Sequence, residues 1–468
     1  MKKYSIQANL EVDIFNVVNN EACLFHDQFK EPYISINNEP TPINKKSFKK
    51  RLTHMIWKRY GTSIPKSKIS TLIEVLEGTA LYDSQMTRLY NRVGQIDNSF
   101  YYDLGNGSVI KTDPMGWSQE KAPILFRKYS HQLPQVEPIT SGDIWKIFDF
   151  LNVQEEHRLL FLAYLISCFI PDIAHPILHP HGPQGAAKST LCKIIKKLCD
   201  PSSISVLEAP KAYNKCVQTL SHHHICFFDN VSNISPRISD LLAQACTGTG
   251  FSKRKLYTND DDVIYSIQNC VGLNGINLAI DKADLMDRSI IIKMDRIPEE
   301  KRMAESTLWD EFEQSKPHIL GGIFDTLCKA MKIYPQIEVQ NISRMVDFTQ
   351  WGYAISMALT GSGDKFLKAY KDNMNQQTQE IVQTNSLVQA VLTFMEKRNS
   401  WSGTVKEAYD NLSMIAGSQK SDDSFPRHTN KLRRHLNRVK VTLFERGVEY
   451  IIGEFHNVNG VPIKFKKV

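Results

Sequence analysis

The chain has 468 residues, 42% hydrophobic and 23% charged, which are globular values for a length that suggests about three domains. The formal net charge of +7 is positive but modest, and no low-complexity tract or repeat indicates a fibrous or disordered protein. The longest apolar run, residues 159–171, is too short to span a bilayer, and the N-terminus lacks the apolar segment of a signal peptide. We therefore expect a cytoplasmic protein with no membrane partner.

Cysteine and histidine usage excludes two kinds of stabilising site. The nine cysteines are scattered without a C-x-x-C pair, so we expect buried thiols in a reducing compartment and no disulfide framework. His222, His223 and His224 are consecutive, a geometry that does not aim three imidazoles at one metal ion. We interpret them as a surface turn, and no zinc pattern is present.

Residues 1 to about 140 predict a mixed α+β region. A strand is expected at residues 33–36, a basic helix at 46–60, and a hairpin at 100–110 that turns through Gly-Asn-Gly. The basic helix could contact DNA, although such helices are more often simply solvated. The proline-containing residues 132–138 are expected to be a linker to the next region.

A glycine-rich loop opens the second region. Residues 181–190 (HGPQGAAKST) follow the apolar Ile177-Leu178 and precede a helical pattern, so they predict a phosphate-binding strand–loop–helix unit. The pattern is G-x-x-x-x-A-K-S, with Ala187 at the place of the usual last glycine. Lys188 would neutralise the β- and γ-phosphates of ATP, and Ser189 would ligate Mg²⁺. The residues expected to cradle the nucleotide are Gly182, Pro183, Gln184, Gly185, Ala186, Ala187, Lys188, Ser189 and Thr190.

An acidic residue follows the next long apolar strand. Asp229 comes after residues 224–228 and is the expected partner of the Mg²⁺ shell, which is the Walker B role. Many ATPases place a glutamate next, as the base that polarises the attacking water, but this chain has Asn230. An amide orients water without accepting its proton. Either Asn230 only positions the nucleophile, or another carboxylate serves as the base, and the candidate is Glu208 after the strand-like residues 204–207.

A third apolar run, from residue 269, ends in asparagines. Asn274, or alternatively Asn277, could contact the γ-phosphate from a strand that lies between the strand before the glycine-rich loop and the strand before Asp229. The other interpretation is that Asn274 and Gly275 form an Asn-Gly turn. Arg288 follows a short helix and precedes the apolar strand 289–292. Ring ATPases keep there the finger that reaches a neighbour's γ-phosphate. Its alternative role is a salt bridge to Asp284 or Asp287.

Two further elements complete the second region. Residues 251–266 alternate, turn at 259–262 and return, which predicts a β-hairpin. Helices are expected at 309–332 and 344–359, with Pro317 and Pro335 as breakers and Arg344 opening the second helix.

The last region, from about residue 385, predicts a winged helix. Helices are expected at 387–397, 404–412 and 426–439, followed by strands at 448–452 and 461–465 around an Asn-Gly turn. The third helix has no acid and is expected to contact duplex DNA; its alternative use is in protein contacts only. The candidate DNA contacts on it are Arg427, Lys431, Arg433, Arg434 and Arg438.

Residues 181–294 resemble the AAA+ core of replicative helicases carried by mobile elements. The resemblance is greatest to the Rep and Cch proteins of staphylococcal pathogenicity islands and resistance cassettes, which are MCM-like, self-loading initiator helicases. It extends over most of the chain and is carried by residues 81–102, 228–232, 256–258, 273–276, 287–289 and 344–348.

The resemblance implies a homohexameric ring that uses ATP and Mg²⁺ and moves along single-stranded DNA held in its pore. It also implies that the hairpin enters the pore, where Lys253, Arg254 and Lys255 would contact the strand. The resemblance further implies that the helices at 309–332 and 344–359 form a lid over the nucleotide, from which Arg344 would contact ATP. The acidic turn of the hairpin fits a DNA contact poorly, and a contact with the next subunit is the alternative.

The expected fold class is therefore α/β. An AAA+ P-loop core with its lid (141–380) is expected between an N-terminal α+β domain (1–140) that forms a collar or DNA contact and a C-terminal winged-helix domain (381–468). The expected function is that of an ATP-dependent replicative DNA helicase and initiator of a mobile element, with duplex origin DNA bound by the winged helix. The alternative is a nucleotide-switched, origin-binding initiator that does not unwind.

Overall fold

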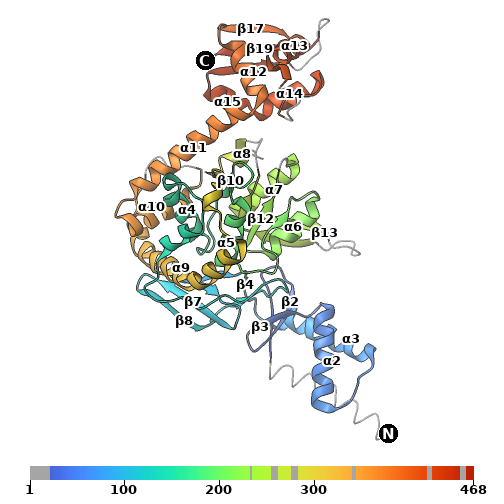
Figure 1. The fold of residues 1–468 in the computed structure, drawn as a ribbon. Coiled ribbons are helices and arrows are strands. Elements are labelled where there is room, and N and C mark those ends of the chain that lie inside the picture. Colours follow the sequence, from blue (N-terminus) through green and yellow to red (C-terminus); the bar gives the residue numbers. More distant parts are fainter. Residues whose placement is uncertain are drawn as a thin grey trace.

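The computed structural model describes residues 22–231, 234–254, 262–275, 283–339, 344–418, 424–453 and 460–468. An N-terminal part lies at one end of the molecule and a C-terminal part at the other (Figure 1). The long helix α11 (Asp364–Thr384) leads from the central body to the C-terminal part. Within the described ranges, no helix combines the length and apolarity needed to cross a bilayer.

The N-terminal part begins with a small sheet and two helices. Strands β1 (Cys23–His26), β2 (Pro32–Ile36) and β3 (Glu39–Pro42) pair antiparallel in that order. Helix α2 (Lys46–Tyr60) buries Phe48, Leu52 and Ile56 at helical spacing, and α3 (Lys66–Gly78) packs in the same core. The strand and helix predicted in this region are confirmed.

A second sheet joins the N-terminal part to the body. Its order is β5 (Val93–Ile96), β6 (Ser99–Asp103), β7 (Ser108–Asp113) and β8 (Gly116–Lys121), so the predicted hairpin is β6–β7. The short strands β4 (Leu89–Tyr90) and β9 (Leu125–Phe126) pair beside it. The ring of Tyr102 packs against Phe169 and Phe324 of the body. This sheet therefore belongs to the same hydrophobic core as the body.

The body is built on a five-stranded parallel sheet. Its order is β11 (Leu207–Glu208), β12 (Ile225–Asp229), β15 (Cys270–Leu273), β10 (Ile177–His181) and β16 (Ser289–Lys293). Helices cover its faces, so the strands are buried continuously and not in alternation. The helices of this region are α5 (Lys188–Cys199), α6 (Tyr213–His222), α7 (Pro236–Thr247) and α8 (Ala283–Met286). Of the strand expected at 204–207, only Leu207 pairs with β12, and the pairing continues to Glu208.

The predicted hairpin is confirmed as β13 (Thr249–Arg254) and β14 (Asp262–Ile267), which pair antiparallel in six-residue register. It extends away from the body (Figure 1). Lys255 and residues 259–261 of the acidic turn lie outside the described residues, and Asp262 begins β14.

Four helices pack beside the sheet: α4 (Glu155–Ser167), α9 (Glu305–Ile333), α10 (Val346–Thr360) and α11, with short 3-10 turns at Ile144–Asp149, Glu299–Lys301 and Tyr334–Gln336. The prediction that Pro317 breaks the first lid helix is wrong, because α9 runs through it. The carbonyls of Pro317 and His318 accept bonds of 3.1 Å from the amides of Ile139 and Asp143, so tertiary contacts stabilise the helix around the proline. Pro335 does mark the end of α9, which stops at Ile333.

The C-terminal part contains α12 (Ser386–Met395), β17 (Ser400–Thr404), α13 (Val405–Ala416), α14 (Thr429–Arg438), α15 (Lys440–Glu445), β18 (Val448–Ile452) and β19 (Pro462–Lys467). The sheet order is β17-β19-β18, antiparallel. The third predicted helix begins later than expected because the backbone of His428 is extended, so Arg427 precedes the helix. Strand β17 and helix α15 were not predicted.

Candidate nucleotide-binding site

The glycine-rich loop connects the carboxyl end of β10 to the first turn of α5. Gly182 has φ 143° and lies against the chain after β16, where an added Cβ would come within 2.1 Å of the Met294 carbonyl oxygen. Gly185 has φ 80°. Ala187 adopts the left-handed conformation, with φ 63°, at the place of the usual last glycine. The loop thus keeps its geometry with alanine, at a cost of about 1–2 kcal/mol relative to glycine.

Lys188 is folded over this loop. Its ammonium donates hydrogen bonds to the carbonyl oxygens of Gly182 (2.7 Å) and Pro183 (2.8 Å). Burial lowers the pKa of Lys188, and the nearby Asp229 carboxylate opposes this effect. These carbonyls stand in for anionic oxygens, so the loop positions a positive charge beside the N-terminus of α5.

Ser189, Asp229 and Asn274 meet at the same edge of the sheet. Asp229 ends β12 and Asn274 directly follows β15, and the carboxyl ends of these parallel strands are neighbours. The Ser189 hydroxyl donates to Asp229 Oδ2 (3.2 Å), and the Asn274 amide donates to Ser189 Oγ (3.0 Å) and to Asp229. Since Asn274 is only 2% exposed, its amide is held in place between the loop helix and β12.

A cavity of about 520 Å³ opens over these residues. Its size is suited to a small ligand such as a nucleotide, and Ser189 and Asp229 supply the oxygen donors that Mg²⁺ prefers. The described residues hold no cluster of three or more His, Cys, Asp or Glu that could hold a metal ion. The cavity is lined by Gln184, Gly185, Ala186, Ala187, Lys188, Ser189, Thr190, Asp229, Asn230, Asn274 and Gly275.

Asn230 lines the cavity, whereas Glu208 does not. Asn230 has φ 52°, and its backbone N–H donates a hydrogen bond to Asp229 Oδ1 (2.8 Å). Glu208 pairs with Asp229 in the strand register, but it is exposed and borders a separate hollow next to α6. Among the described residues that line the nucleotide cavity, Asp229 carries the only carboxylate. Asn277, the alternative sensor, lies outside the described residues.

Arg288 and Arg344 lie at the opposite edge of the sheet. The Arg288 carbonyl accepts a bond from the amide of Ile177, at the beginning of β10, whereas the loop follows the other end of that strand. A strand of this length separates the two edges by about 16 Å. Arg344 precedes α10 without opening it, and its guanidinium lies 3.8 Å from the Asp287 carboxylate. This position does not support the expectation that Arg344 reaches ATP from the lid.

Arg296 is a loop neighbour that the sequence analysis missed. An added Cβ on Gly185 would lie 3.7 Å from Arg296 Cγ, and the amide of the next residue, Ile297, donates to the Gly185 carbonyl (3.1 Å). The segment after β16 thus closes over the loop. Only the position of Arg296 in the sequence could have indicated its role, because it follows the carboxyl end of β16, a parallel strand adjacent to β10.

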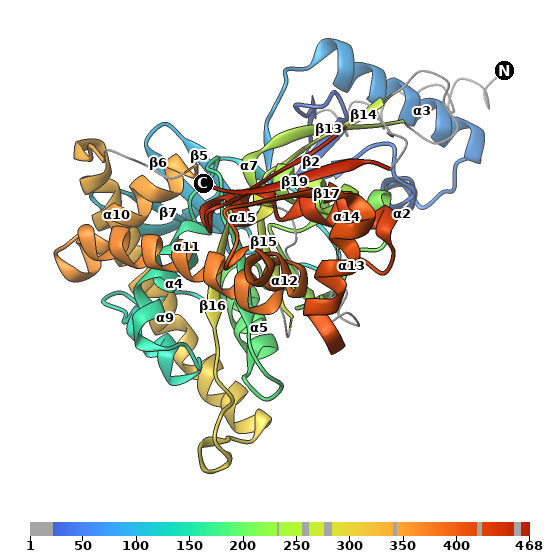
Figure 2. The same ribbon diagram turned by 90° about the horizontal axis from the view of Figure 1, so that it is seen from above.

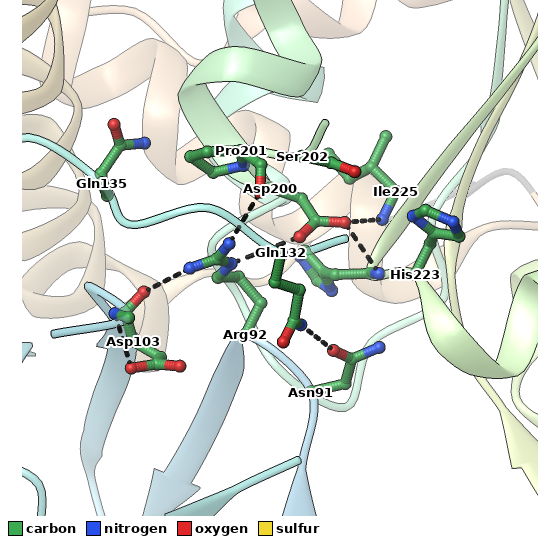
Figure 3. Close-up of polar contacts among 12 residues, drawn as sticks. Asn91, Arg92, Asp103, Gln132, Gln135, Asp200, Pro201, Ser202, His223 and Ile225 are labelled. Carbon is green, nitrogen blue, oxygen red and sulfur yellow. Dashed lines mark hydrogen bonds and ion pairs between the residues drawn. The ribbon is translucent and has the colours of Figure 1, made fainter. Parts of the chain in front are cut away.

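The far end of α5 is fixed by a buried ionic network (Figure 3). Asp200, directly after α5, accepts bonds from Arg92 Nε (3.3 Å) and Lys196 Nζ (2.5 Å) and from the amide of His224 (3.1 Å). Burial raises the pKa of Asp200, but Lys196 and Arg92 outweigh that effect and hold it well below its ordinary value. Helix α5 therefore runs from the glycine-rich loop at its first residue to a paired, buried carboxylate at its end.

Arg92 brings the N-terminal part into this network. Its guanidinium donates to the carbonyls of Asp103, Leu133 and Pro201, each at 3.0 Å. Gln135, in the predicted linker, is buried and donates to the carbonyl of Leu198 (2.6 Å) in the last turn of α5. Residues 132–138 thus connect two parts of the chain but are packed against both.

The prediction that His222–His224 form a surface turn is wrong for two of the three. His223 and His224 are each 5% exposed, and His223 Nδ1 lies 3.1 Å from Lys196 Nζ. Burial lowers the pKa of His223 to about 3, with the positive charge of Lys196 acting in the same direction. His223 and His224 directly precede the buried strand β12, so their side chains are buried with it. The prediction that the cysteines are buried thiols is confirmed for eight of the nine, and Cys23 is exposed.

Comparison with known proteins identifies the chain at family level. The family model described as "Actinomycete integrative conjugative element replication protein" matches residues 143–380, which is half of the chain. The chain belongs to this family, AICE RepA. The model of the AICE RepA C-terminal domain matches residues 387–461. The protein is thus a replication protein of a mobile-element family.

Other comparisons add little to the AICE RepA assignment. The search of curated proteins found no significant match. A solved structure titled as the A form apo structure of the NrS-1 C-terminal region shares 13% identity, covers 97% of this chain and 98% of that one, and has a TM-score of 0.45. A further apo structure of the NrS-1 C-terminal region (305-718) shares 12% identity over the same fractions, with a TM-score of 0.43. Such values do not establish a common fold.

Proposed function

We propose that this protein is an ATP-dependent DNA helicase that initiates replication of a mobile element, with an AAA+ P-loop core and a C-terminal winged helix. The observation that carries the proposal is the convergence of Lys188, Ser189, Asp229 and Asn274 at one sheet edge. Strand β15 lies between β10 and β12, which is the arrangement expected for a strand that senses the γ-phosphate. The narrower assignment to the staphylococcal Rep and Cch type stays a prediction.

Each residue has a defined task in this proposal. When bound, Mg²⁺–ATP would supply the phosphoanhydride bond whose hydrolysis drives the protein. Lys188 would exchange the loop carbonyls for β- and γ-phosphate oxygens, and Ser189 and Asp229 would hold the metal shell. Asn274 and Asn230 would orient the attacking water through their amides, while a proton acceptor would have to come from outside the described lining.

The position of Arg288 supports the proposal that the subunits form a ring. Because it lies at the sheet edge away from the loop of its own subunit, it is suited to complete the site of a neighbouring one. Within the proposed hexamer, the β13–β14 hairpin would project into the pore and contact single-stranded DNA through Lys253 and Arg254. The proposal places Arg344 at the same subunit boundary, beside Asp287.

The C-terminal part supplies the proposed duplex contacts. Helix α14 buries Leu432 and Leu436, and its other side chains include no acid. Arg433 and Arg434 are exposed on that helix, as are Lys431 within it and Arg427 before it, while Arg438 is half-buried. A basic helix followed by the β18–β19 strands has the form that contacts phosphates in a DNA groove.

The test is strand separation on forked DNA that carries either a 3′ or a 5′ single-stranded tail, with ATP, comparing wild type with Lys188→Ala. We expect ATP-dependent unwinding of one of the forks by wild type and none by the variant, since Lys188 is the only cation among the described residues that line the cavity. Circular dichroism should show that the variant is folded. Unimpaired unwinding by the folded variant would overturn the proposal.

A second function is favoured by one observation. Asn230 stands where a catalytic glutamate is common, and Asp229 is the only carboxylate among the described residues of the cavity. A nucleotide-switched initiator would bind ATP and origin DNA but would not turn over. Phosphate release measured with and without DNA separates the two: turnover stimulated by single-stranded DNA favours the helicase, and ATP binding without release favours the switch.

A further inference from the structure

We infer that the solvent face of helix α2 is a binding surface for single-stranded nucleic acid, distinct from the hairpin and from the C-terminal helix. The inference deepens the proposed function and rests on it. Lys46, Lys50 and Trp57 lie on one face of α2, since they are four and seven residues apart. The opposite face carries Phe48, Leu52 and Ile56, which are buried.

The charge on this face is uncompensated. Helix α2 contains no aspartate or glutamate, and Lys46 and Lys50 form no ion pair with the described residues. Of the other cations on the helix, Arg51 pairs with Glu39 at 3.8 Å and Lys49 donates to Ser70 Oγ at 2.9 Å, so they belong to the local structure. The rise of the helix spaces Lys46 and Lys50 by about 6 Å along its axis, and Trp57 follows about 10 Å beyond Lys50.

Trp57 distinguishes this face from an ordinary solvated one. Its side chain is 57% exposed, although an indole is normally buried for most of its area. A flat aromatic ring beside lysines is the combination that binds single strands: bases stack on the ring whatever their identity, and ammonium groups neutralise the phosphates. The occupant that fits both groups is therefore an unpaired nucleic-acid strand.

The buried face of α2 argues against a membrane surface. An interfacial helix must insert apolar side chains between lipids, but Phe48 and Leu52 are each 1% exposed and pack in a core with α3. Only the polar face and Trp57 are accessible. Position also supports a strand: the α2–α3 unit and the β13–β14 hairpin lie on the same side of the molecule in two perpendicular views (Figures 1 and 2). A strand that leaves the hairpin can therefore continue toward α2.

The experiment measures binding of fluorescein-labelled oligo(dT) to the full chain over a range of salt concentrations. Trp57→Ala should weaken binding about tenfold, because stacking of one base contributes about 1–3 kcal/mol. Trp57→Phe should restore most of the affinity. The double variant Lys46→Gln, Lys50→Gln should reduce the slope of log affinity against log salt by about 1.4, for two phosphate contacts on a single strand.

Matched controls are available on other exposed surfaces. Tyr82→Ala removes an aromatic side chain that is 86% exposed, and Lys371→Gln removes an exposed lysine of α11; neither should change binding. ATP hydrolysis without DNA should be unchanged in all variants. If wild type binds oligo(dT) but Trp57→Ala and the double lysine variant bind equally well with the same salt slope, the inference is wrong and the proposed function stands. If wild type neither binds oligo(dT) nor hydrolyses ATP, the proposed function fails as well.

Discussion

At the scale of single residues, Ala187 shows that the glycine-rich loop can hold a left-handed turn without a glycine at this position. Its φ of 63° belongs to the left-handed region, where a methyl group is tolerated at a cost and a branched side chain clashes. The neighbouring Lys188 and Ser189 depend on this turn, because it aims the first residues of α5 at the cavity. The conformation of Ala187 is therefore expected to control nucleotide affinity.

We expect Ala187→Gly to bind a fluorescent ATP analogue at least as tightly as wild type. Glycine relieves the left-handed strain, although its greater freedom in the unfolded chain offsets part of the gain, so the stability change should stay within about 1 kcal/mol. Ala187→Val should weaken nucleotide binding about tenfold or more, since a β-branched residue resists this φ. Equal affinities for the Val and Gly variants would show that the loop does not depend on this turn.

Arg288 is expected to act across a subunit boundary. Arg288→Ala should bind nucleotide normally but hydrolyse it poorly, because the guanidinium stabilises charge that develops in the transition state. Mixing Arg288→Ala protein with Lys188→Ala protein should recover part of the ATPase activity, since some interfaces in a mixed ring have both residues intact. Steady-state phosphate release from the mixture measures this. No gain, under conditions in which subunits are shown to exchange, would contradict a role in trans.

The sequence predicted the residues whose placement is local and missed those that depend on long-range contacts. Lys188, Asp229 and Asn274 could be found because each is tied to the carboxyl end of a strand in a parallel sheet, and such ends meet at one edge. Asp229 ends β12, Asn274 directly follows β15, and Lys188 follows the loop after β10. The Arg92–Asp200 contact joins residues 108 apart in the chain, and no local pattern indicates it. Similarly, the role expected for Arg344 followed from the family resemblance, whereas its contact with Asp287 depends on how the segment before α10 packs.

At the scale of elements, α5 is held at both ends, and we expect its far end to dominate local stability. Arg92→Ala would leave the buried Asp200 carboxylate with one cation fewer and should lower the free energy of unfolding by about 3–5 kcal/mol. Arg88→Ala is the matched control, because its pair with Asp172 is half-exposed on both sides and should be worth at most about 1 kcal/mol. Urea unfolding followed by circular dichroism compares the two. Equal losses for both variants would contradict a special role for the buried pair.

Buried neutral histidines within β10 and just before β10 and β12 predict destabilisation by mild acid. Burial lowers the pKa of His179 and of His223 to about 3 and that of His175 to about 4. Between these values and the ordinary pKa of about 6.5, the unfolded chain binds more protons than the folded one, so stability falls as the pH drops below about 6.5. The melting temperature should therefore be lower at about pH 5 than at about pH 7.

The pH effect can be assigned with two variants. His179→Gln should reduce the loss of melting temperature on acidification, because it removes one group that is neutral when folded and charged when unfolded. His54→Gln, at an exposed position on α2, should leave the loss unchanged. A melting temperature that is flat between about pH 7 and about pH 5 in wild type would exclude this account.

At the same scale, the presence of the helices was predicted better than the residues at which they begin and end. Helix α2 has the predicted bounds because its apolar spacing and the left-handed Gly61 after its last residue are local signals. Helix α9 passes through Pro317, since contacts with residues 139–143 and the close approach allowed by Gly321 compensate locally. Helix α14 begins at Thr429 because the backbone of His428 is extended. At Pro317 the surroundings outweigh the residue's intrinsic preference.

At the scale of the whole molecule, one part of the chain shares the hydrophobic core of the body and another part has a separate core. The β5–β8 sheet and the body form one hydrophobic cluster, joined further by Arg92 and Gln135. The C-terminal part has a core of its own, and α11 leads to it from the body. Removal of the C-terminal part should therefore leave the nucleotide site intact, whereas removal of residues 89–135 should not.

The last prediction follows from this separation. Arg433→Gln with Arg434→Gln removes two exposed positive charges from α14, so affinity for duplex origin DNA should fall and its slope against log salt should decrease by about 1.8. ATP hydrolysis without DNA should be unchanged, because neither residue lies near the cavity beside Lys188. Truncation after about residue 385 should likewise keep ATP hydrolysis and lose most duplex affinity, while Lys371→Gln serves as the charge control. A folded truncated protein that loses ATPase activity, or one that keeps full duplex affinity, would show that the C-terminal part has a different role.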